Sequence, residues 1–445
     1  MLEAPLVDAA DPNRRLLWVR GRATTVAEFT AEVAAVAAAL PQGTYLTNLC
    51  ERRDHFLRAY CAAVVRGQTN LLPPSHAPLA IEECMAAHPG SYRCDDATVA
   101  RALTEHKGRE PLTVQAVTVP EAHVVQIAFT SGSTGAPRAH VKRWRNLLGS
   151  TRFNAERVRA SLAARYAEAP PAIVATVPAQ HMYGTETSVL LPLLSPMAVH
   201  AGRPLFPADV VTALSEVPPP RVLVTTPVHL RALAVAGLGL PEVATIVSAT
   251  APLERELARS VERATGATVL EMFGSTETCV IATRLTALED AWRLYPGVVL
   301  TPSGDGATVR APWFDVPTTL QDVIELVPPD GFVVRGRHLD MIEVAGKRAS
   351  LADLTRRILD IPGVRDAVVF QAQAPDAGAV RRVTALVVAP GLAPPAIAAQ
   401  LSRSIDPAFI PRPLLVVPAL PRNELGKLSL EALHALAASQ LSSSA

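Results

Sequence analysis

Apolar runs of strand length alternate with stretches of helical periodicity from Gly43 onward. This alternation predicts a parallel sheet that is covered by helices. The run Val124 to Phe129 predicts a buried strand, and a helix is expected from about Trp144. Further strands are predicted at Ala172 to Val177, Val222 to Thr225, Val243 to Ser248 and Val269 to Met272. Between the last two strands we expect a helix that Pro252 opens at its first turn.

The rhythm changes after Arg337 to that of a smaller unit. Helices are expected near Leu351 to Leu359 and Ala396 to Ser404, and strands near Ala367 to Phe370, Val383 to Val388 and Leu414 to Val417. A chain of 445 residues is too long for one compact core. The predicted fold class is therefore α/β, with a large N-terminal domain of helix-covered parallel sheets over residues 1–337 and a small α+β domain over residues 338–445.

The composition argues against several classes of partner. With a formal net charge of +1, the chain has no overall field that would favour nucleic acid or an acidic membrane surface. No apolar run reaches the roughly 18 residues that a membrane span needs, so we expect a soluble cytoplasmic protein. The five cysteines are scattered and lack C-x-x-C spacing, which predicts reduced thiols rather than disulfides or a zinc site.

The strongest chemical signal is a hydroxyl-rich turn directly after the predicted buried strand. It reads Thr130, Ser131, Gly132, Ser133, Thr134, Gly135, Ala136 and Pro137. Hydroxyl and backbone N–H groups of such a turn donate to a polyanion, and the glycines let the backbone approach it closely. No G-K-[ST] closes the loop, so it is not a Walker loop. An ordinary polar turn is the alternative, but the preceding strand and the length of the pattern favour phosphate binding.

A second motif, Met272 to Thr278, also follows a predicted strand. Glu277 can hold a hard cation such as Mg²⁺, and Phe273 offers a flat face for stacking on a base. Taken alone, a glutamate after a Ser-Thr pair is more often a helix-capping residue. The presence of the first loop reverses that balance in favour of a metal ligand.

Two weaker signals lie toward the C-terminus. A carboxylate at Asp322 suits a ribose diol and a guanidinium at Arg337 suits a phosphate, so the two residues could grip a nucleotide. The stretch Pro421 to Lys427 ends with a lysine after a glycine. A lone exposed lysine is nearly always a solvated charge, and a role for Lys427 as a clamp on phosphate and carboxylate rests on the three motifs upstream.

Together these four stretches resemble the adenylate-forming superfamily of acyl-CoA synthetases, nonribosomal adenylation domains and luciferases. The resemblance extends from about Gly43 to Lys427. It implies ATP and Mg²⁺ as cofactors, activation of a small carboxylic acid as an acyl-adenylate, and transfer of the acyl group to a thiol. It also implies that the small domain is a mobile lid that carries a catalytic lysine.

The resemblance implies a role for each matching residue. Thr130, Ser131, Gly132, Ser133, Thr134 and Gly135 would handle the ATP phosphates, Phe273, Gly274 and Thr250 the adenine, Thr276 the AMP phosphate, Glu277 the Mg²⁺, Asp322 the ribose, Arg337 the domain junction, and Lys427 the ATP and the substrate carboxylate. Among these, Thr130, Glu277, Arg337 and Lys427 would be catalytic. The substrate pocket would be formed by His181, Tyr183 and Gly184, with Ser248 and Ala249 across from them.

Several positions depart from the pattern of the superfamily. The basic residue after the hydroxyl-rich turn is Arg138, with Lys142 as a second candidate. Ala249 and Thr250 replace two glycines, and the hinge position holds Leu339 with Asp340 next to it, which leaves the pivot unassigned. A packed loop residue is as good an interpretation of His181 as a substrate contact.

Within the superfamily, the run Thr134 to Trp144 and the triplet Gly346-Lys347-Arg348 are similar to small stand-alone AMP-ligases of bacterial aryl-polyene and xanthomonadin-type pigment pathways. This resemblance implies an aryl acid such as 4-hydroxybenzoate, and the phosphopantetheine of an acyl carrier protein, or CoA, as thiol acceptor. The alternatives are a medium-chain fatty acyl-CoA ligase and a non-catalytic nucleotide-binding homologue. Loss of Lys427, Glu277 or Asp322 would mark the non-catalytic homologue, and all three are present.

Overall fold

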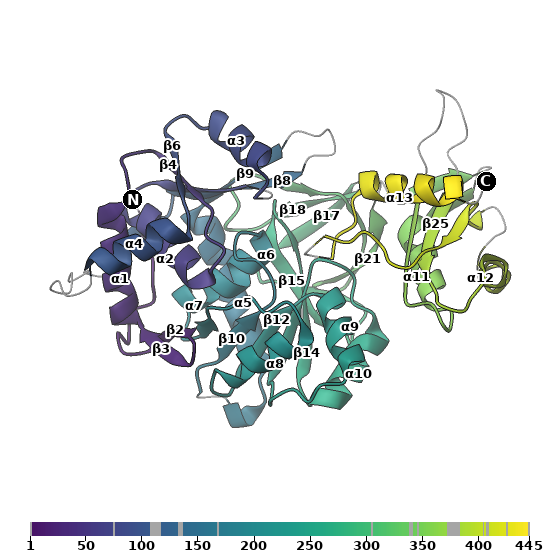
Figure 1. The fold of residues 1–445 in the computed structure, drawn as a ribbon, viewed down its shortest axis with the longest axis horizontal. Coiled ribbons are helices and arrows are strands. Elements are labelled where there is room, and N and C mark those ends of the chain that lie inside the picture. Colours follow the sequence, from purple (N-terminus) through teal and green to yellow (C-terminus); the bar gives the residue numbers. More distant parts are fainter. Residues whose placement is uncertain are drawn as a thin grey trace. The chain divides into compact units, whose positions relative to one another are not determined.

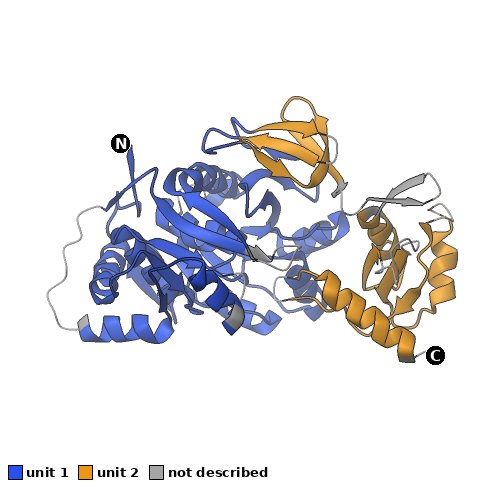
Figure 2. Cartoon of the chain, turned by 90° about the horizontal axis from the view of Figure 1, so that it is seen from above, with its two compact units in different colours: residues 1–298, 311–316 blue, residues 299–310, 317–445 orange. Residues whose placement is uncertain are grey.

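The computed structural model describes residues 2–73, 76–106, 117–131, 137–166, 169–303, 306–337, 341–344, 347–371, 383–403, 405, 409–423 and 426–443. The chain divides into two compact units (Figure 2). Unit 1 comprises Met1–Val298 and Ala311–Val316, and unit 2 comprises Val299–Arg310 and Pro317–Ala445. The predicted domain boundary at residue 337 is a different division of the chain and stays a prediction.

A long mixed sheet runs through unit 1 in the order β16-β15-β14-β13-β12-β10-β11-β2-β3 (Figure 1). Its parallel strands are β2 (Arg15–Val19), β10 (Ala172–Ala175), β11 (Ala198–His200), β12 (Arg221–Thr225), β13 (Thr245–Ser248) and β14 (Thr268–Ser275). Antiparallel strands flank them at β3 (Arg22–Thr25), β15 (Cys279–Leu285) and β16 (Trp292–Leu294). The predicted α/β class is confirmed, since four of these parallel strands fall on predicted ones.

Three helices cover one face of this sheet, namely α8 (Pro207–Ser215), α9 (Pro227–Ala236) and α10 (Arg255–Thr265). Apolar residues of these helices form one buried cluster with strands β10, β12, β13 and β14. The expectation that Pro252 opens the helix after β13 is wrong, because α10 begins at Arg255. The preceding segment is instead tied to the sheet, since the backbone N–H of Leu253 donates to Glu271 Oε1 at 3.1 Å.

A second sheet of unit 1 has the order β6-β4-β5-β8-β9. Its strands are β4 (Tyr45–Asn48), β5 (Thr69–Leu72), β6 (Ser91–Cys94) and β8 (Val124–Ser131), which are parallel, and the antiparallel β9 (Pro137–Arg143). The N-terminal helices are α1 (Val26–Ala39), α2 (Arg53–Val65), α3 (Pro78–Ala86) and α4 (Asp96–His106), and β1 (Glu3–Pro5) pairs with β7 (Thr118–Pro120). Helix α1 begins with a capping box between Thr25 and Glu28.

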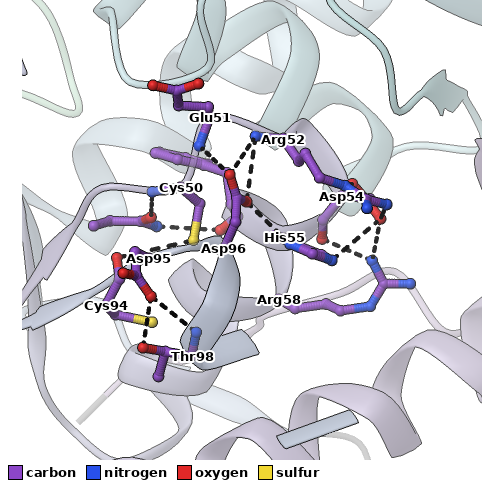
Figure 3. Close-up of polar contacts among 12 residues, drawn as sticks. Cys50, Glu51, Arg52, Asp54, His55, Arg58, Cys94, Asp95, Asp96 and Thr98 are labelled. Carbon is purple, nitrogen blue, oxygen red and sulfur yellow. Dashed lines mark hydrogen bonds and ion pairs between the residues drawn. The ribbon is translucent and has the colours of Figure 1, made fainter. Parts of the chain in front are cut away.

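Helix α2 is fixed at its N-terminus by charged side chains (Figure 3). Asp96 accepts from the backbone N–H of Glu51 at 3.1 Å and lies 3.0 Å from His55 Nδ1. The fully buried Arg53 donates to five acceptors at the ends of β10 and β11 and nearby, among them Val177 O at 2.6 Å. Burial lowers the pKa of Arg53 to about 9, and the charge of Arg203 adds to the shift. These contacts join α2 to the long sheet.

The remaining helices of unit 1 follow β9 in the chain. They are α5 (Trp144–Ala160), a 3-10 helical turn (Ala164–Tyr166), α6 (Met182–Thr185), the π-helical segment Glu186–Leu190 and α7 (Leu191–Leu194). Helix α5 begins at the residue where a helix was expected. Both α5 and α6 pack against β15.

Unit 2 contains a three-stranded antiparallel sheet and a hairpin in its first part. The sheet is formed by β17 (Val299–Ser303), β18 (Gly306–Arg310) and β19 (Thr318–Leu320), and the hairpin by β20 (Asp322–Val327) and β21 (Gly331–Arg337). A short hairpin of β22 (Met341–Val344) and β23 (Lys347–Ser350) follows.

The last part of unit 2 is a small α+β arrangement. Strands β24 (Asp366–Gln371), β25 (Val383–Val388) and β26 (Leu414–Val416) form its sheet, and its helices are α11 (Leu351–Leu359), α12 (Pro394–Leu401) and α13 (Leu430–Ser443). Apolar clusters lie against both faces of the sheet. The predicted elements here are confirmed, with α12 ending at Leu401 instead of Ser404.

Two general expectations can be compared with the structure. All five cysteines are buried free thiols. Within the described ranges, no helix combines the length and the apolar character that crossing a bilayer requires.

Candidate active site

The hydroxyl-rich turn connects two paired strands. Strand β8 ends at Ser131 and β9 begins at Pro137, with Thr130 opposite Arg138 in the antiparallel register. Residues Gly132, Ser133, Thr134 and Gly135 lie outside the described residues, as do the side chains of Thr130 and Ser131. The structure therefore places this turn after a buried parallel strand, as predicted, and the phosphate contacts of its residues stay predictions.

The second motif forms a tight turn between β14 and β15, which we call the Glu277 turn and define as residues 275–279. Ser275 N–H donates to Thr278 Oγ1 at 3.0 Å, and Thr278 N–H donates to Ser275 Oγ at 3.3 Å. Cys279 has a left-handed backbone with φ +59°, an unusual conformation for a residue other than glycine. Thr276 and Glu277 stand half-buried at the end of this hairpin.

Gly274 is required by the close packing of the two strands. A Cβ atom at this position would lie 2.2 Å from Cys279 O, which is backbone and cannot rotate away. The backbone of the strand that leads into the Glu277 turn thus leaves no room for any side chain at residue 274.

Two basic side chains of β9 lie beside Glu277. Lys142 Nζ donates to the backbone oxygen of Glu277 at 2.6 Å, and His140 Nε2 lies 3.7 Å from Glu277 Oε1. Burial by itself would raise the pKa of Glu277, but hydrogen bonds from Ser275 and the backbone, with the charges of His140 and Lys142, hold it below the ordinary value. Glu277 is therefore a carboxylate at neutral pH.

A single ionised glutamate fits a magnesium ion that arrives with a nucleotide. Mg²⁺ in nucleotide sites is usually held by one or two carboxylates together with substrate phosphates. Among the described residues, no three His, Cys, Asp or Glu side chains are grouped closely enough to hold a metal ion on their own. The donor set at Glu277 thus suits a metal whose other ligands are phosphate oxygens and water.

The predicted adenine contacts come from two segments, the end of β14 and the residues that follow β13. The Phe273 ring packs against the Trp292 ring, with centroids 5.2 Å apart. The Arg284 guanidinium lies over the Trp292 ring, 4.3 Å from its centroid. Thr250 follows β13 with φ +82°, although no glycine stands there. The stacking role of Phe273 and the adenine role of Thr250 stay predictions.

Among the predicted pocket residues, Tyr183 reaches the ends of β12 and β13. Tyr183 Oη lies 3.1 Å from Thr225 O and 3.0 Å from Val247 O, so the side chain of α6 reaches the residue next to Ser248. Because one proton serves two carbonyls, Tyr183 Oη can accept a hydrogen bond from a substrate phenol but has no second proton to donate.

Three other pocket predictions have clear positions. His181 is the half-buried N-cap of α6, and a Cβ at Gly184 would lie 1.9 Å from Pro178 O. Ala249 is buried. Ser248 is fully buried, and its Oγ has no hydrogen-bond partner among the described residues.

In unit 2 the predicted ribose and junction residues are cross-strand neighbours. Asp322 lies directly opposite Arg337 in the β20–β21 hairpin. The side chain of Arg337 and the predicted hinge residues Leu339 and Asp340 lie outside the described residues. The hairpin thus brings the two residues together along the backbone, and their contacts with a nucleotide stay predictions.

Lys427 stands in a closed loop of unit 2, which we call the lysine loop and define as residues 421–428. Lys427 N–H donates to Asn423 Oδ1 at 2.8 Å, and Gly426 adopts φ +77°. Arg422 binds Asp366 through two nitrogens at 2.8 and 2.7 Å and also donates to Gly426 O. The side chain of Lys427 is exposed.

Residues 51–310 match the family model described as AMP-binding enzyme. The chain belongs to the AMP-binding enzyme family. Two curated relatives are named 4-coumarate–CoA ligase. The protein from Rhodobacter capsulatus is 31% identical over 53% of this chain and 57% of its own length, and that from Halorhodospira halophila is 29% identical over 69% and 75%. The chain thus spans little more than half the length of the first of these relatives.

The fold is also shared with solved structures. The o-succinylbenzoate CoA synthetase of Bacillus subtilis in complex with its acyl-adenylate intermediate superposes with a TM-score of 0.78 at 18% identity, covering 96% of this chain and 97% of that chain. The same enzyme in complex with ATP and a magnesium ion gives a TM-score of 0.78 over 96% and 98%. At this identity the likeness concerns the fold alone.

For this AMP-binding family member, sequence reasoning missed two supporting residues. Lys142 was considered only as an aid to the phosphates, yet it is 4% exposed and contacts the backbone of Glu277. Glu186 was not considered, although it is 1% exposed and accepts from Val280 N–H at 3.1 Å. The available sequence signal was the position of Glu186 shortly before the apolar run Val189 to Leu194, because an acidic residue buried among apolar residues needs a hydrogen-bond partner.

Proposed function

We propose that the protein is an ATP- and Mg²⁺-dependent acid–thiol ligase that forms AMP. The observation that carries this proposal is an ionised carboxylate, Glu277, at the end of a hydrogen-bonded hairpin in a chain of the AMP-binding enzyme family. The names of the two curated relatives, 4-coumarate–CoA ligase, support the same reaction class.

The proposed reaction has two balanced steps. A carboxylate oxygen of the acid attacks the α-phosphorus of ATP, the bond to the bridging oxygen breaks, and pyrophosphate leaves. A thiolate then attacks the acyl carbon, and AMP leaves as the C–O bond breaks. Glu277 would hold Mg²⁺, which when bound would neutralise part of the phosphate charge.

We assign distinct roles to the residues of the chain. The hydroxyl-rich turn, Thr130 to Gly135, binds phosphates, and Lys427 neutralises charge that develops on phosphorus. Thr276 contacts the α-phosphate, Phe273, Gly274 and Thr250 surround adenine, and Asp322 binds the ribose. Residues 338–445, beginning after Arg337, act as a lid that changes position between the two steps.

For the acid, we propose an aryl carboxylate such as 4-hydroxybenzoate. A buried hydroxyl without a partner costs about 1–3 kcal/mol, and a hydroxylated acid could recover that cost at Ser248. Tyr183 Oη has lone pairs left to accept from a phenol. His181, Gly184 and Ala249 complete the proposed pocket.

For the acceptor, we propose the phosphopantetheine thiol of an acyl carrier protein, with CoA as the alternative that the names of the relatives favour. Five free cysteines and the use of ATP favour the cytoplasm as its compartment.

The test is pyrophosphate release with a panel of acids that includes 4-hydroxybenzoate, 4-coumarate, benzoate and octanoate. Release that depends on an aryl acid supports the proposal, release with octanoate alone identifies a medium-chain ligase, and no release with any acid overturns ligase activity. Thioester formation is then compared between CoA and a holo-carrier protein.

The metal role is tested by Glu277→Gln, which keeps the size of the side chain and removes its charge. We expect pyrophosphate release to require a much higher Mg²⁺ concentration. Glu105→Gln, at an exposed position of α4, is the matched control and should behave as wild type. An unchanged Mg²⁺ dependence in the Glu277 variant would refute the metal assignment.

A further inference from the structure

Lys142 links the two sheets of unit 1. It stands on β9, in the second sheet, and its Nζ donates to the backbone oxygen of Glu277 at 2.6 Å, in the hairpin of the long sheet. The Lys142 side chain is 4% exposed. Its neighbour Val141, on the opposite face of the strand, is 52% exposed. A buried ammonium group is costly unless charges or hydrogen bonds compensate it.

Glu186 supports the other end of the Glu277 turn. It is the first residue of the π-helical segment, and both its carboxylate oxygens accept from Val280 N–H at 3.1 Å. Asn154 Nδ2 donates to Glu186 Oε1 at 3.2 Å, and Tyr295 Oη donates to Asn154 Oδ1 at 2.7 Å. Short π-helical insertions are frequent at functional sites.

Two ionisable groups are thus buried beside the Glu277 turn. Burial raises the pKa of Glu186 above its ordinary value, and hydrogen bonds from Val280, Ser150 and Asn154, with the charge of Lys142, offset only part of that rise. The Lys142 ammonium also lies beside the buried Cys279 thiol. Apolar side chains of similar size would usually stabilise such an interior as well or better, so stability alone does not account for the two buried polar groups.

We propose that Lys142 and Glu186 are positioning residues, which hold the Glu277 turn at its carbonyl and at Val280 so that the Glu277 carboxylate is fixed for a metal–nucleotide complex. This rests on the proposed function. The left-handed backbone at Cys279 has to be maintained by its surroundings, and these two contacts lie on either side of it in the sequence. Neither residue touches the reacting atoms in this assignment.

The experiment compares Lys142→Met with Val141→Met, which places the same side chain at the exposed neighbouring position. Binding of Mn²⁺ in the presence of saturating ATP is measured by electron paramagnetic resonance, and binding of ATP in excess EDTA by equilibrium dialysis. We expect Lys142→Met to weaken Mn²⁺ binding roughly 10- to 100-fold, because a hydrogen bond from a charged group is lost. ATP binding in EDTA should be unchanged, and Val141→Met should equal wild type in both.

A second variant keeps the test decisive if Lys142→Met does not fold. Glu186→Gln preserves the shape and one acceptor for Val280 N–H but removes the charge. We expect it to weaken Mn²⁺ binding roughly 3- to 10-fold, again without loss of ATP binding in EDTA. In the double variant, the loss should be smaller than the product of the two single losses, because both contacts hold the same turn.

The outcomes separate this inference from the proposed function. If wild type binds Mn²⁺ in an ATP-dependent way and the folded variants bind it equally well, the positioning role is wrong and the proposed function stands. A loss of ATP binding in EDTA that equals the loss of Mn²⁺ binding would also overturn it, since general damage to the site would explain both. If wild type itself shows no ATP-dependent Mn²⁺ binding, the proposed function fails first.

Discussion

The Glu277 turn of unit 1 and the lysine loop of unit 2 are closed in the same way, but the residues that support them differ in burial. In each, a polar side chain closes a short turn by accepting from a backbone N–H, Thr278 in one and Asn423 in the other. The Glu277 turn is supported by Lys142 and Glu186, which are 4% and 1% exposed. The lysine loop is supported by Arg422 and Asp366, whose side chains are 23% and 20% exposed.

This difference in burial predicts whether a variant loses only activity or both activity and stability. Supports that are fully buried are part of the interior of unit 1, so a change there alters both the folded state and the position of Glu277. Lys427 is exposed, and its contact with Asn423 is made by the backbone N–H, which an alanine at this position keeps. Variants of the two regions should therefore differ in whether loss of activity is accompanied by loss of stability.

The largest effect on activity is expected for Lys427→Ala. Removal of a group that neutralises developing charge should lower the rate of adenylate formation roughly 100- to 1,000-fold. The free energy of unfolding should change by less than about 0.5 kcal/mol, since the side chain is exposed. Pyrophosphate release and urea unfolding measure the two quantities, with Arg403→Ala as an exposed cationic control in the same unit.

Lys427→Ala also distinguishes the two steps of the reaction. ATP binding and transfer from a preformed acyl-adenylate should be retained. Equal losses in adenylate formation, ATP binding and transfer would show that the role assigned to Lys427 is wrong.

The next effect is expected for Gly274→Ala, beside the Glu277 turn. The new Cβ would lie 2.2 Å from Cys279 O, so the hairpin must shift. We expect destabilisation by about 1–3 kcal/mol, as for other overpacked sites, together with a clear rise in the Mg²⁺ concentration that activity requires. Gly239→Ala is the matched control, because a Cβ there has nothing within 4 Å. Normal Mg²⁺ dependence in a destabilised Gly274 variant would show that the shape of the Glu277 turn does not affect metal binding.

A smaller effect is expected for Asp366→Asn, which weakens the support of the lysine loop. Arg422 loses a charged partner that it contacts at 2.8 and 2.7 Å, and such bonds contribute about 1.5–3 kcal/mol. Because this pair is partly exposed, we expect the lower end of that range in urea unfolding and a several-fold loss of adenylate formation. Asp360→Asn, which removes an exposed partner of Arg356, is the control. An Asp366 variant with full activity would show that the loop keeps its shape without Arg422.

The sequence predicted the fold best where a regular pattern covers a whole element. Strand β25 and helix α11 coincide with the predicted residues, since their apolar periodicity starts and stops sharply. The N-terminal strands β2 and β3 were not predicted: β2 joins the long sheet through pairing with β11, far away in the sequence, and β3 joins it only through β2. Long-range pairing of this kind leaves little local signal.

The candidate site was predicted in the same uneven way. Glu277 was identified because its motif is local, whereas its supports come from β9 and the π-helical segment. A lysine in a strand next to a hydroxyl-rich turn suggests a phosphate contact, and only the structure shows that Lys142 points to a carbonyl. Local chemistry can be predicted from residue types, but the partners of buried charges depend on tertiary packing.

The smallest effect is expected for Ser248→Ala, which compares an unpartnered buried hydroxyl in the described part of unit 1 with the partnered groups that support the Glu277 turn. The polar groups that support the Glu277 turn have partners, whereas Ser248 Oγ is buried without one among the described residues. If an acid completes this site, Ser248→Ala should raise the KM for a hydroxylated aryl acid several-fold and leave the KM for ATP unchanged. Removing an unsatisfied hydroxyl should leave the free energy of unfolding unchanged or raise it by about 1 kcal/mol. Ser215→Ala, on the exposed part of α8, is the control. A destabilised Ser248 variant with an unchanged KM for the acid would mean that the hydroxyl serves the fold and not the substrate.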